Sequence, residues 1–157
     1  FLWRYHQATP ADGMIGVFNR SHYEDVLVVR VKDLAPEELW RSRFDSINDF
    51  ERMLVREGTT ILKFFLHISK EEQLKRFEAR RNDPLKAWKL TDEDWRNRGK
   101  RAAYEAALEE MFERTHTDRA PWRIVPAESK RYARVHVVRE VIAAIERSAA
   151  SGERVKA

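Results

Sequence analysis

The sequence predicts an α/β fold in which a parallel sheet is covered by helices on both faces. Three short apolar runs, at residues 15–18, 59–68 and 122–125, alternate with segments of helical periodicity. A strand that is buried on both faces is apolar along its length, and strands that alternate with helices are typical of a parallel sheet. The chain of 157 residues is long enough for one domain with a hydrophobic core.

The first elements predict a helix, a strand and a second helix. Residues 1–9 carry apolar side chains at helical spacing before a turn that contains proline and glycine. After the apolar run 15–18, Ser21 and Glu24 have the spacing of a capping box, in which each side chain binds the backbone N–H of the other residue. The β-branched run 26–31 favours a strand, but the cap favours a helix, and we predict a helix.

The middle of the chain repeats the order of helix, strand and helix. Pro36 suits a first helical turn, and apolar side chains then recur every three to five positions up to Gly58. The run 59–68 predicts the second strand, and Ser69 and Glu72 form another capping-box pattern at its exit. The remaining elements are a helix that ends before Pro84, a long helix over 91–114, a strand over 122–125, a closing helix over 128–147 and a loose tail over 148–157.

Composition narrows the class of protein. The 30 Lys and Arg exceed the 26 Asp and Glu, and this modest excess indicates an anionic ligand without choosing among phosphate, nucleic acid and a membrane surface. The chain has no cysteine, no apolar run long enough to span a bilayer and no secretion signal, so we predict a cytoplasmic protein. The five histidines lack the spacing of a zinc site.

Polar residues follow the first predicted strand, where α/β proteins bind ligands. Glu24 and Asp25 are carboxylates of the kind that holds Mg²⁺, but a capping and helix-dipole role explains them equally well. Asn19 and Arg20 precede them, and Arg20 has no local acidic partner outside the cap, which indicates a phosphate partner.

A second candidate is the basic stretch over residues 75–89. Its charge density is suited to a polyanion, although a solvated helix face is the commoner explanation of such a run. Trp88 within it is the best candidate for stacking on a base. The stretch contains Lys75, Arg76, Arg80, Arg81, Lys86 and Lys89.

Five segments, taken in order, resemble the second family of polyphosphate kinases over residues 1 to about 147. They are FLWRYH, GMIGVFNRSHYEDVLVVRV, INDFERML, GTTILKFFLHISKEEQLKRFEARRNDPLKAWK and APWRIVPAESKRYAR. The resemblance implies a thymidylate-kinase-like P-loop kinase fold, a three-layer α/β/α arrangement with a helical lid at about 69–114. It also implies Mg²⁺-dependent phosphoryl transfer between inorganic polyphosphate and nucleotides. The expected assembly is a homo-oligomer, a dimer or a tetramer, without nucleic acid or membrane partners.

The same resemblance assigns roles to residues. The run 15–18 is similar to the Walker B strand, and another branch of the family has Asp in place of Asn19, so Glu24 and Asp25 would supply the missing charge and bind the metal. The NRSHYED form resembles the branch that accepts nucleoside mono- and diphosphates, which predicts AMP and ADP as acceptors. Arg20, Glu24 and Asp25 would be catalytic. The implied substrate-binding residues are Arg4, Asn19, His22, Tyr23, Arg76, Arg80, Arg81, Lys86, Lys89, Lys130 and Arg134.

One element of the family pattern is not found in these residues. The Walker A loop would precede Phe1, and its strand would lie between the first two predicted strands, so residues 1–147 would form a partial kinase core. We therefore expect a partner segment, from another piece of chain or another subunit, and direct pairing of those two strands would contradict this. Two alternatives stay open: an ATP-dependent nucleotide kinase of the same fold, and an inactive fragment that only binds polyphosphate.

Overall fold

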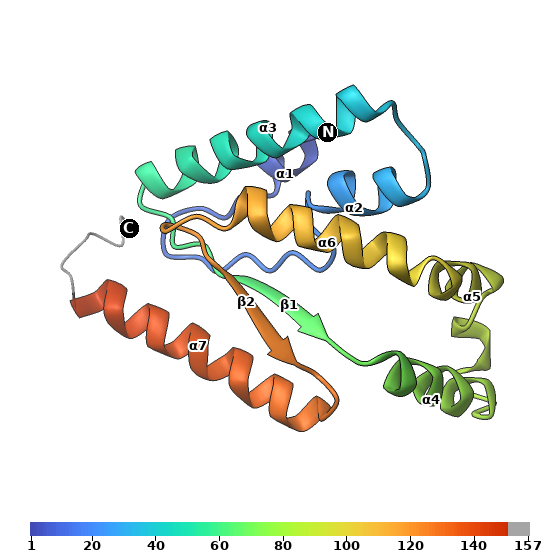
Figure 1. Cartoon of the computed structure of the whole chain (residues 1–157). Coiled ribbons are helices and arrows are strands. Elements are labelled where there is room, and N and C mark those ends of the chain that lie inside the picture. Colours follow the sequence, from blue (N-terminus) through green and yellow to red (C-terminus); the bar gives the residue numbers. More distant parts are fainter. Residues whose placement is uncertain (151–157) are drawn as a thin grey trace.

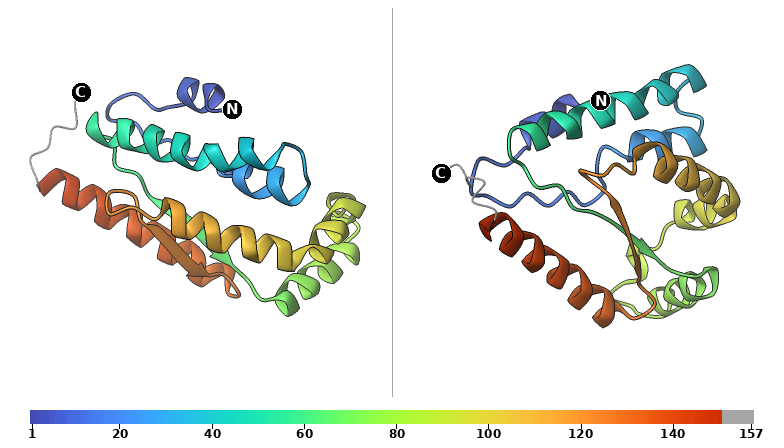
Figure 2. Two further views of the ribbon diagram at one scale, coloured as in Figure 1. Left: turned by 45° about the horizontal axis from the view of Figure 1, so that its top comes forward. Right: turned by 60° about the vertical axis from the view of Figure 1, so that its left-hand side comes forward.

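A computed structural model of the chain describes residues 1–150 and contains helices on both faces of a small sheet (Figure 1). Helix α7 covers one face, while α2, α3 and α6 lie on the other, and α4 and α5 lie beyond the far end of β1 (Figures 1 and 2). In order, the elements are α1 (Trp3–Gln7), α2 (Glu24–Val31), α3 (Glu37–Arg56), β1 (Lys63–His67), α4 (Lys70–Arg81), η1 (Ala87–Lys89), α5 (Asp92–Gly99), α6 (Arg101–Thr115), β2 (Trp122–Pro126) and α7 (Lys130–Ala150).

The two strands of residues 1–150 are parallel, as predicted. Lys63 pairs with Trp122 at one end of the sheet and His67 pairs with Pro126 at the other. Side chains alternate between the faces, so Phe65 packs against Phe112 of α6. On the opposite face, Phe64 packs on the cluster that β2 forms with α7. The predicted second and third strands are thereby confirmed, with the second shortened to five residues.

The larger hydrophobic core lies between α2, α3 and α6. Its side chains come from α3, from α6, from the β-branched run of α2, which is a helix as predicted, and from Tyr23 directly before α2. A smaller cluster joins β2 to α7. The larger cluster contains Tyr23, Val26, Trp40, Phe44, Ile47 and Met111, and the smaller contains Val125, Ala127 and Ala133.

The predicted first strand is wrong in this structure. Residues 15–18 form no strand, and the side chains of Ile15 and Val17 are 69% and 85% exposed. A strand requires a neighbour to accept and donate its backbone hydrogen bonds, and this segment has none among residues 1–150. It is not paired with β1 either, so the arrangement that would contradict the expected partner segment is not observed.

Two of the predicted caps differ from the structure. The box at Ser21 and Glu24 is wrong, since α2 begins after Tyr23 and the Ser21 hydroxyl accepts only a long bond, 3.4 Å, from the Tyr23 N–H. At Ser69 half of the box forms. The Ser69 Oγ accepts from the Glu72 N–H at 3.1 Å, but the Ser69 N–H donates to Glu128 at 2.8 Å.

The long helix predicted over 91–114 is divided into α5 and α6. At the predicted start of this helix Thr91 and Asp94 form a capping box, with the Thr91 N–H donating to Asp94 Oδ2 at 2.8 Å. The division falls at Lys100, directly after Gly99, because glycine disfavours a continuous helix.

The last helix is longer than predicted. It continues to Ala150, so part of the expected tail is helical, and residues 151–157 of that tail lie outside the described residues. Within the part of the chain that the structure describes, none of the helices has the length and apolar character needed to cross a membrane.

Candidate functional site

A cavity of about 760 Å³ lies at the carboxyl end of β1, between the sheet, α2, α6 and the helices α4 and α5. Val28, Phe65 and Leu108 supply an apolar lining. Parallel sheets commonly bind ligands at this edge. The charged side chains around the cavity are Arg20, Glu24, Lys32, Lys89, Glu93, Asp94, Arg98, Arg101 and Glu105.

The turn before α2 brings two predicted catalytic residues to this cavity. Arg20 and Glu24 both line it, and Arg20 Nε lies 3.8 Å from Glu24 Oε1. Arg20 has a φ of 61°, a left-handed conformation that is rare for residues with a side chain. The preceding Asn19 is exposed and does not line the cavity.

Asp25 has different surroundings from Glu24. It is 7% exposed, forms an ion pair with Arg43 of α3, and lies 3.9 Å from Arg4 of α1. It does not line the cavity. The geometry thus links Asp25 and Arg4 to each other and leaves Glu24 as the predicted carboxylate that faces the cavity.

His22 and Tyr23, predicted to bind substrate, are buried beneath the turn. Tyr23 donates its hydroxyl proton to Glu51 Oε1 at 2.5 Å, and His22 Nε2 lies 3.4 Å from the same oxygen. Burial and the neighbouring Glu51 carboxylate raise the pKa of Tyr23 far above its ordinary value. These side chains contact the core and do not line the cavity.

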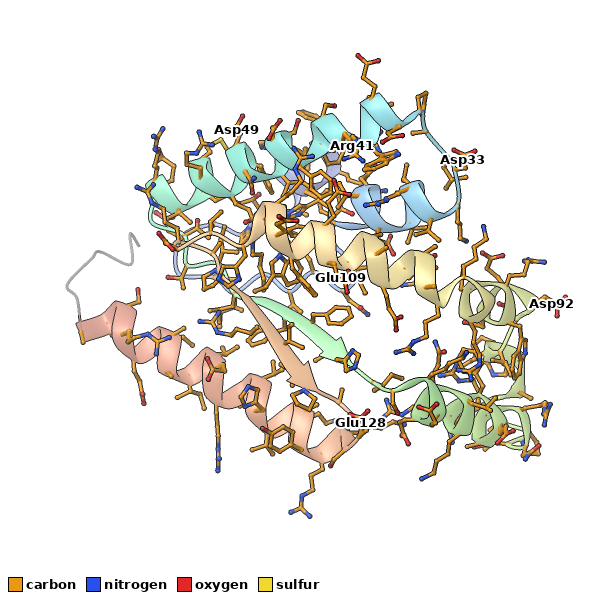
Figure 3. The ribbon with its side chains drawn as sticks, in the orientation of Figure 1. Asp33, Arg41, Asp49, Asp92, Glu109 and Glu128 are labelled. Carbon is orange, nitrogen blue, oxygen red and sulfur yellow. The ribbon has the colours of Figure 1, made fainter. Side chains whose placement is uncertain are left out.

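The predicted basic stretch contributes one residue, Lys89, to the cavity. Arg76 is instead engaged by the protein: Nε donates to Glu72 at 2.8 Å, and Nη2 donates to the carbonyl oxygens of Ala127 and Glu128 at 2.6 and 2.9 Å. Figure 3 shows Glu128 at the start of α7, beside α4. This bridge attaches α4 to the end of the sheet.

The other predicted cations lie outside the cavity. Lys86 pairs with Asp83 next to it, while Arg80 and Arg81 are at the end of α4. Trp88, the stacking candidate, is 75% exposed and has Lys89 over its ring. Lys130 and Arg134 are exposed on the first turns of α7.

Several residues that line the cavity were not predicted. Arg98 donates to the carbonyl oxygen of Lys70 at 2.7 Å, and Arg101 donates to the carbonyl oxygen of Ile68 at 3.2 Å, so both reach across to the start of α4. Tyr104, whose pKa burial raises, also lines the cavity. The basic run RNRGKR at residues 96–101 is the signal in the sequence from which the two arginines could have been found.

Comparison with known proteins gives the family. The family model described as polyphosphate kinase 2 matches residues 1–153. The chain belongs to the polyphosphate kinase 2 family. A solved structure, polyphosphate kinase 2 from Arthrobacter aurescens, has 48% sequence identity and a TM-score of 0.83, and the match covers 87% of this chain and 48% of that one.

Two curated polyphosphate kinase 2 relatives carry names that state their reactions. The AMP/ADP-polyphosphate phosphotransferase of Meiothermus ruber is 51% identical over 84% of this chain and 49% of its own length. The polyphosphate:AMP phosphotransferase of Pseudomonas syringae is 42% identical over 94% of this chain and 30% of its own length. The chain therefore spans about half or less of the relatives that it matches.

The residues of this polyphosphate kinase 2 chain offer limited means of holding a metal. Within residues 1–150 no group of three or more metal-binding side chains comes together. Mg²⁺ is commonly held by one or two carboxylates, with waters and substrate phosphates as its other ligands. Glu24 fits this requirement because its carboxylate faces the cavity, whereas Asp25 is already paired with Arg43.

Proposed function

We propose that the protein carrying this chain transfers phosphoryl groups between inorganic polyphosphate and AMP or ADP, with Mg²⁺. Membership of the polyphosphate kinase 2 family and the named reactions of the relatives support the reaction type. The observation that carries the proposal for these residues is the cavity at the carboxyl end of β1, where five cationic and four acidic side chains surround an apolar lining. We further propose the cytoplasm as its compartment and a homo-oligomer as its assembly.

The cations of the cavity suit this reaction. Phosphoryl transfer requires the reacting groups to be positioned and their negative charge to be stabilised, with little covalent work by the protein. Arg20 enters from the turn before α2, and Arg98 and Arg101 enter from the junction of α5 and α6. In this arrangement phosphates bound in the cavity are approached from two sides by guanidinium groups, which bind phosphate oxygens in pairs.

Glu24 would hold Mg²⁺ beside these phosphates. When bound, the ion neutralises part of the charge on the phosphate chain. Arg20, next to Glu24, keeps the carboxylate in the cavity through their ion pair and offers its remaining donors to substrate. Asp25 has a different role in this proposal, since it anchors the start of α2 to Arg43.

A lid was expected over about 69–114, and we propose α4, η1 and α5 as its moving part, since α6 packs in the core through Met111. Lys89 already lines the cavity, and we propose that Arg80, Arg81 and Lys86 approach the phosphates when the lid closes. Closure would exclude water, which would otherwise accept the phosphoryl group. We propose polyphosphate contacts for Lys130 and Arg134, which are exposed at the start of α7.

The test is ATP formation from ADP, long-chain polyphosphate and Mg²⁺, and ADP formation from AMP, both without added ATP. Product in both reactions supports the proposal. An ATP-dependent nucleotide kinase would form no ADP from AMP under these conditions, and any ATP that it made from two ADP molecules would not depend on polyphosphate. A protein that only binds polyphosphate would retain it in a salt-dependent manner without forming a product, and either outcome would overturn the proposal.

Substitutions test the division of roles between the two acids. Glu24→Gln is expected to lower kcat by roughly a hundredfold or more, because a group that positions charge in the transition state is lost, and to raise the Mg²⁺ concentration needed. Asp25→Asn is expected to lower the melting temperature more than Glu24→Gln does. Glu109 is an exposed acid on α6 outside the cavity, and Glu109→Gln is the matched control (Figure 3). It should leave kcat, the Mg²⁺ requirement and the melting temperature unchanged.

A further inference from the structure

A network of buried polar side chains lies beneath the turn that carries Arg20 and Glu24. Lys63 Nζ lies 2.9 Å from Glu51 Oε2, and the two side chains are 4% and 5% exposed. The Tyr23 hydroxyl lies between them, since it donates to Glu51 Oε1 at 2.5 Å and accepts from Lys63 Nζ at 3.0 Å. The ammonium also donates to the carbonyl oxygen of Thr115 at 2.6 Å, so all three of its protons have partners.

The members of this network come from different parts of the fold. Glu51 lies on α3, Lys63 begins β1, Thr115 ends α6 and Tyr23 directly precedes α2. None of the four lines the large cavity. The network therefore joins the turn to three elements of the core without taking part in the cavity wall.

A buried ion pair contributes little net stability to a core. Apolar residues of similar volume often give equal or greater stability, because both charges lose their hydration when they are buried. In this structure the pair fixes the position of one hydroxyl group. The Tyr23 hydroxyl can donate to Glu51 and accept from Lys63 at the same time in only one position.

The turn above the network has a strained backbone. The left-handed conformation of Arg20, with a φ of 61°, requires contacts of the surrounding residues that fix the chain. His22, Tyr23 and Asp25 are all buried and supply such contacts. Arg20 and Glu24 are the residues of segment 19–25 that line the cavity.

We propose that Glu51 and Lys63 are positioning residues for phosphoryl transfer: by holding the Tyr23 hydroxyl they fix the turn so that Arg20 and Glu24 face the cavity. Neither residue touches substrate or metal in this proposal, and both act through Tyr23. The inference rests on the proposed function, because it assigns Arg20 and Glu24 to the reacting phosphates.

Tyr23→Phe tests the proposal in the protein that carries this chain, because it removes the hydroxyl alone. Thr117→Val is the matched control. It removes a partly buried hydroxyl outside the network, which accepts from the Ala120 N–H at 3.2 Å. Both variants should lower the melting temperature, but only Tyr23→Phe should lower kcat, by roughly tenfold to a hundredfold, as expected when a catalytic group is slightly misplaced.

Combination with Glu24→Gln separates positioning from general stability. If the hydroxyl acts through Glu24, Tyr23→Phe should reduce kcat much less in the Glu24→Gln background than in the wild type. If Tyr23→Phe lowers kcat by the same factor in both backgrounds, the proposal is overturned. Lys63→Met should reproduce the loss of kcat, and Tyr23→Phe retains the test if the lysine variant does not fold.

Hydrogen exchange provides a measurement that does not depend on activity. Amides of residues 19–25 should exchange faster in Tyr23→Phe than in the wild type or in Thr117→Val. If the wild type is active and Tyr23→Phe changes neither kcat nor exchange, the positioning role fails and the proposed function stands. If the wild type transfers no phosphoryl group from polyphosphate, the proposed function itself fails, whatever the exchange rates are.

Discussion

Glu24 and Asp25 are neighbours in the sequence, and their carboxylates enter different environments. At the start of a helix, successive side chains point about 100° apart, so one acid can face the cavity while the next is buried against α3. Sequence reasoning identified both as acids at the end of a predicted strand. It could not separate them, because their difference depends on Arg43, which lies 18 residues away along the chain.

Glu51 shows how a buried residue depends on its neighbours for its charge. Burial alone, the largest influence, raises the pKa of Glu51, but the adjacent His22 imidazole, the Lys63 charge and the Tyr23 hydroxyl together hold the pKa below its usual 4.5. Burial lowers the pKa of Lys63, and the Glu51 charge offsets part of this effect. The folded protein thus favours the ionised carboxylate.

This environment predicts a pH-dependent stability. Because the folded-state pKa of Glu51 lies below its unfolded value, its charge stabilises the fold above about pH 4.5, and that contribution is lost as the pH falls through the folded-state pKa. Glu51→Gln should lower the free energy of unfolding by about 3 kcal/mol at neutral pH, since it leaves Lys63 buried without a charged partner. Urea unfolding from neutral to acidic pH should show that the difference in free energy of unfolding between the wild type and Glu51→Gln becomes smaller in acid. A difference that is constant with pH would contradict the prediction.

At the scale of elements, two glycines at helix ends differ in their backbone conformation. Gly58 follows α3 with a φ of 91°, a conformation that other residues adopt at a cost. Gly99 ends α5 with no positive φ, and an added Cβ there would meet no atom within 4 Å. The first glycine is required by the backbone, whereas the second is not.

Alanine substitutions should therefore have opposite effects at these positions. Gly58→Ala is expected to lower the free energy of unfolding by about 1–2 kcal/mol, because of the left-handed strain. Gly99→Ala is expected to raise it by about 0.5–1 kcal/mol, because alanine loses less backbone entropy in a helix. Chemical denaturation of the two variants and the wild type measures both changes in the free energy of unfolding. If the two substitutions change it in the same direction, the prediction is contradicted.

Helix ends also show the limits of local patterns. At Thr91 a local capping box forms, because the Asp94 carboxylate accepts from both the N–H and the hydroxyl of Thr91. At Ser69, the Glu128 carboxylate takes the backbone N–H that the local acid was expected to bind. Glu128 is 59 residues away, so the sequence pattern contained no sign of this competition.

At the scale of the whole molecule, the largest departure from expectation is the apolar segment 14–18, which is exposed. Met14, Ile15 and Val17 are each more than two-thirds exposed, and the outer stripe of α7 leaves Val138 and Ile142 about half exposed. Contiguous exposed apolar surface commonly marks an interaction site. The expected partner segment beside β1 stays a prediction, and this exposure is consistent with it.

The exposure predicts the behaviour of residues 1–157 prepared alone. The polypeptide should bind the dye ANS and self-associate, because apolar side chains without a partner favour association in water. Replacement of Ile15 and Val17 by serine should reduce both dye fluorescence and the sedimentation coefficient. Arg119→Ser, an exposed control outside the segment, should change neither. A monomer that binds no dye would contradict the prediction.

The amino-acid sequence by itself determined the α/β class, two of the strands and the main helices. These features depend on apolar periodicity and capping residues, both of which are local in the chain. Tertiary structure alone decided that Asp25 pairs with Arg43, that Arg76 bridges to the β2–α7 loop and that Arg98 and Arg101 enter the cavity. It also decided that residues 15–18 form no strand. The physical reason is that pairing, burial and charge neutralisation depend on partners brought together by the fold from distant positions in the chain.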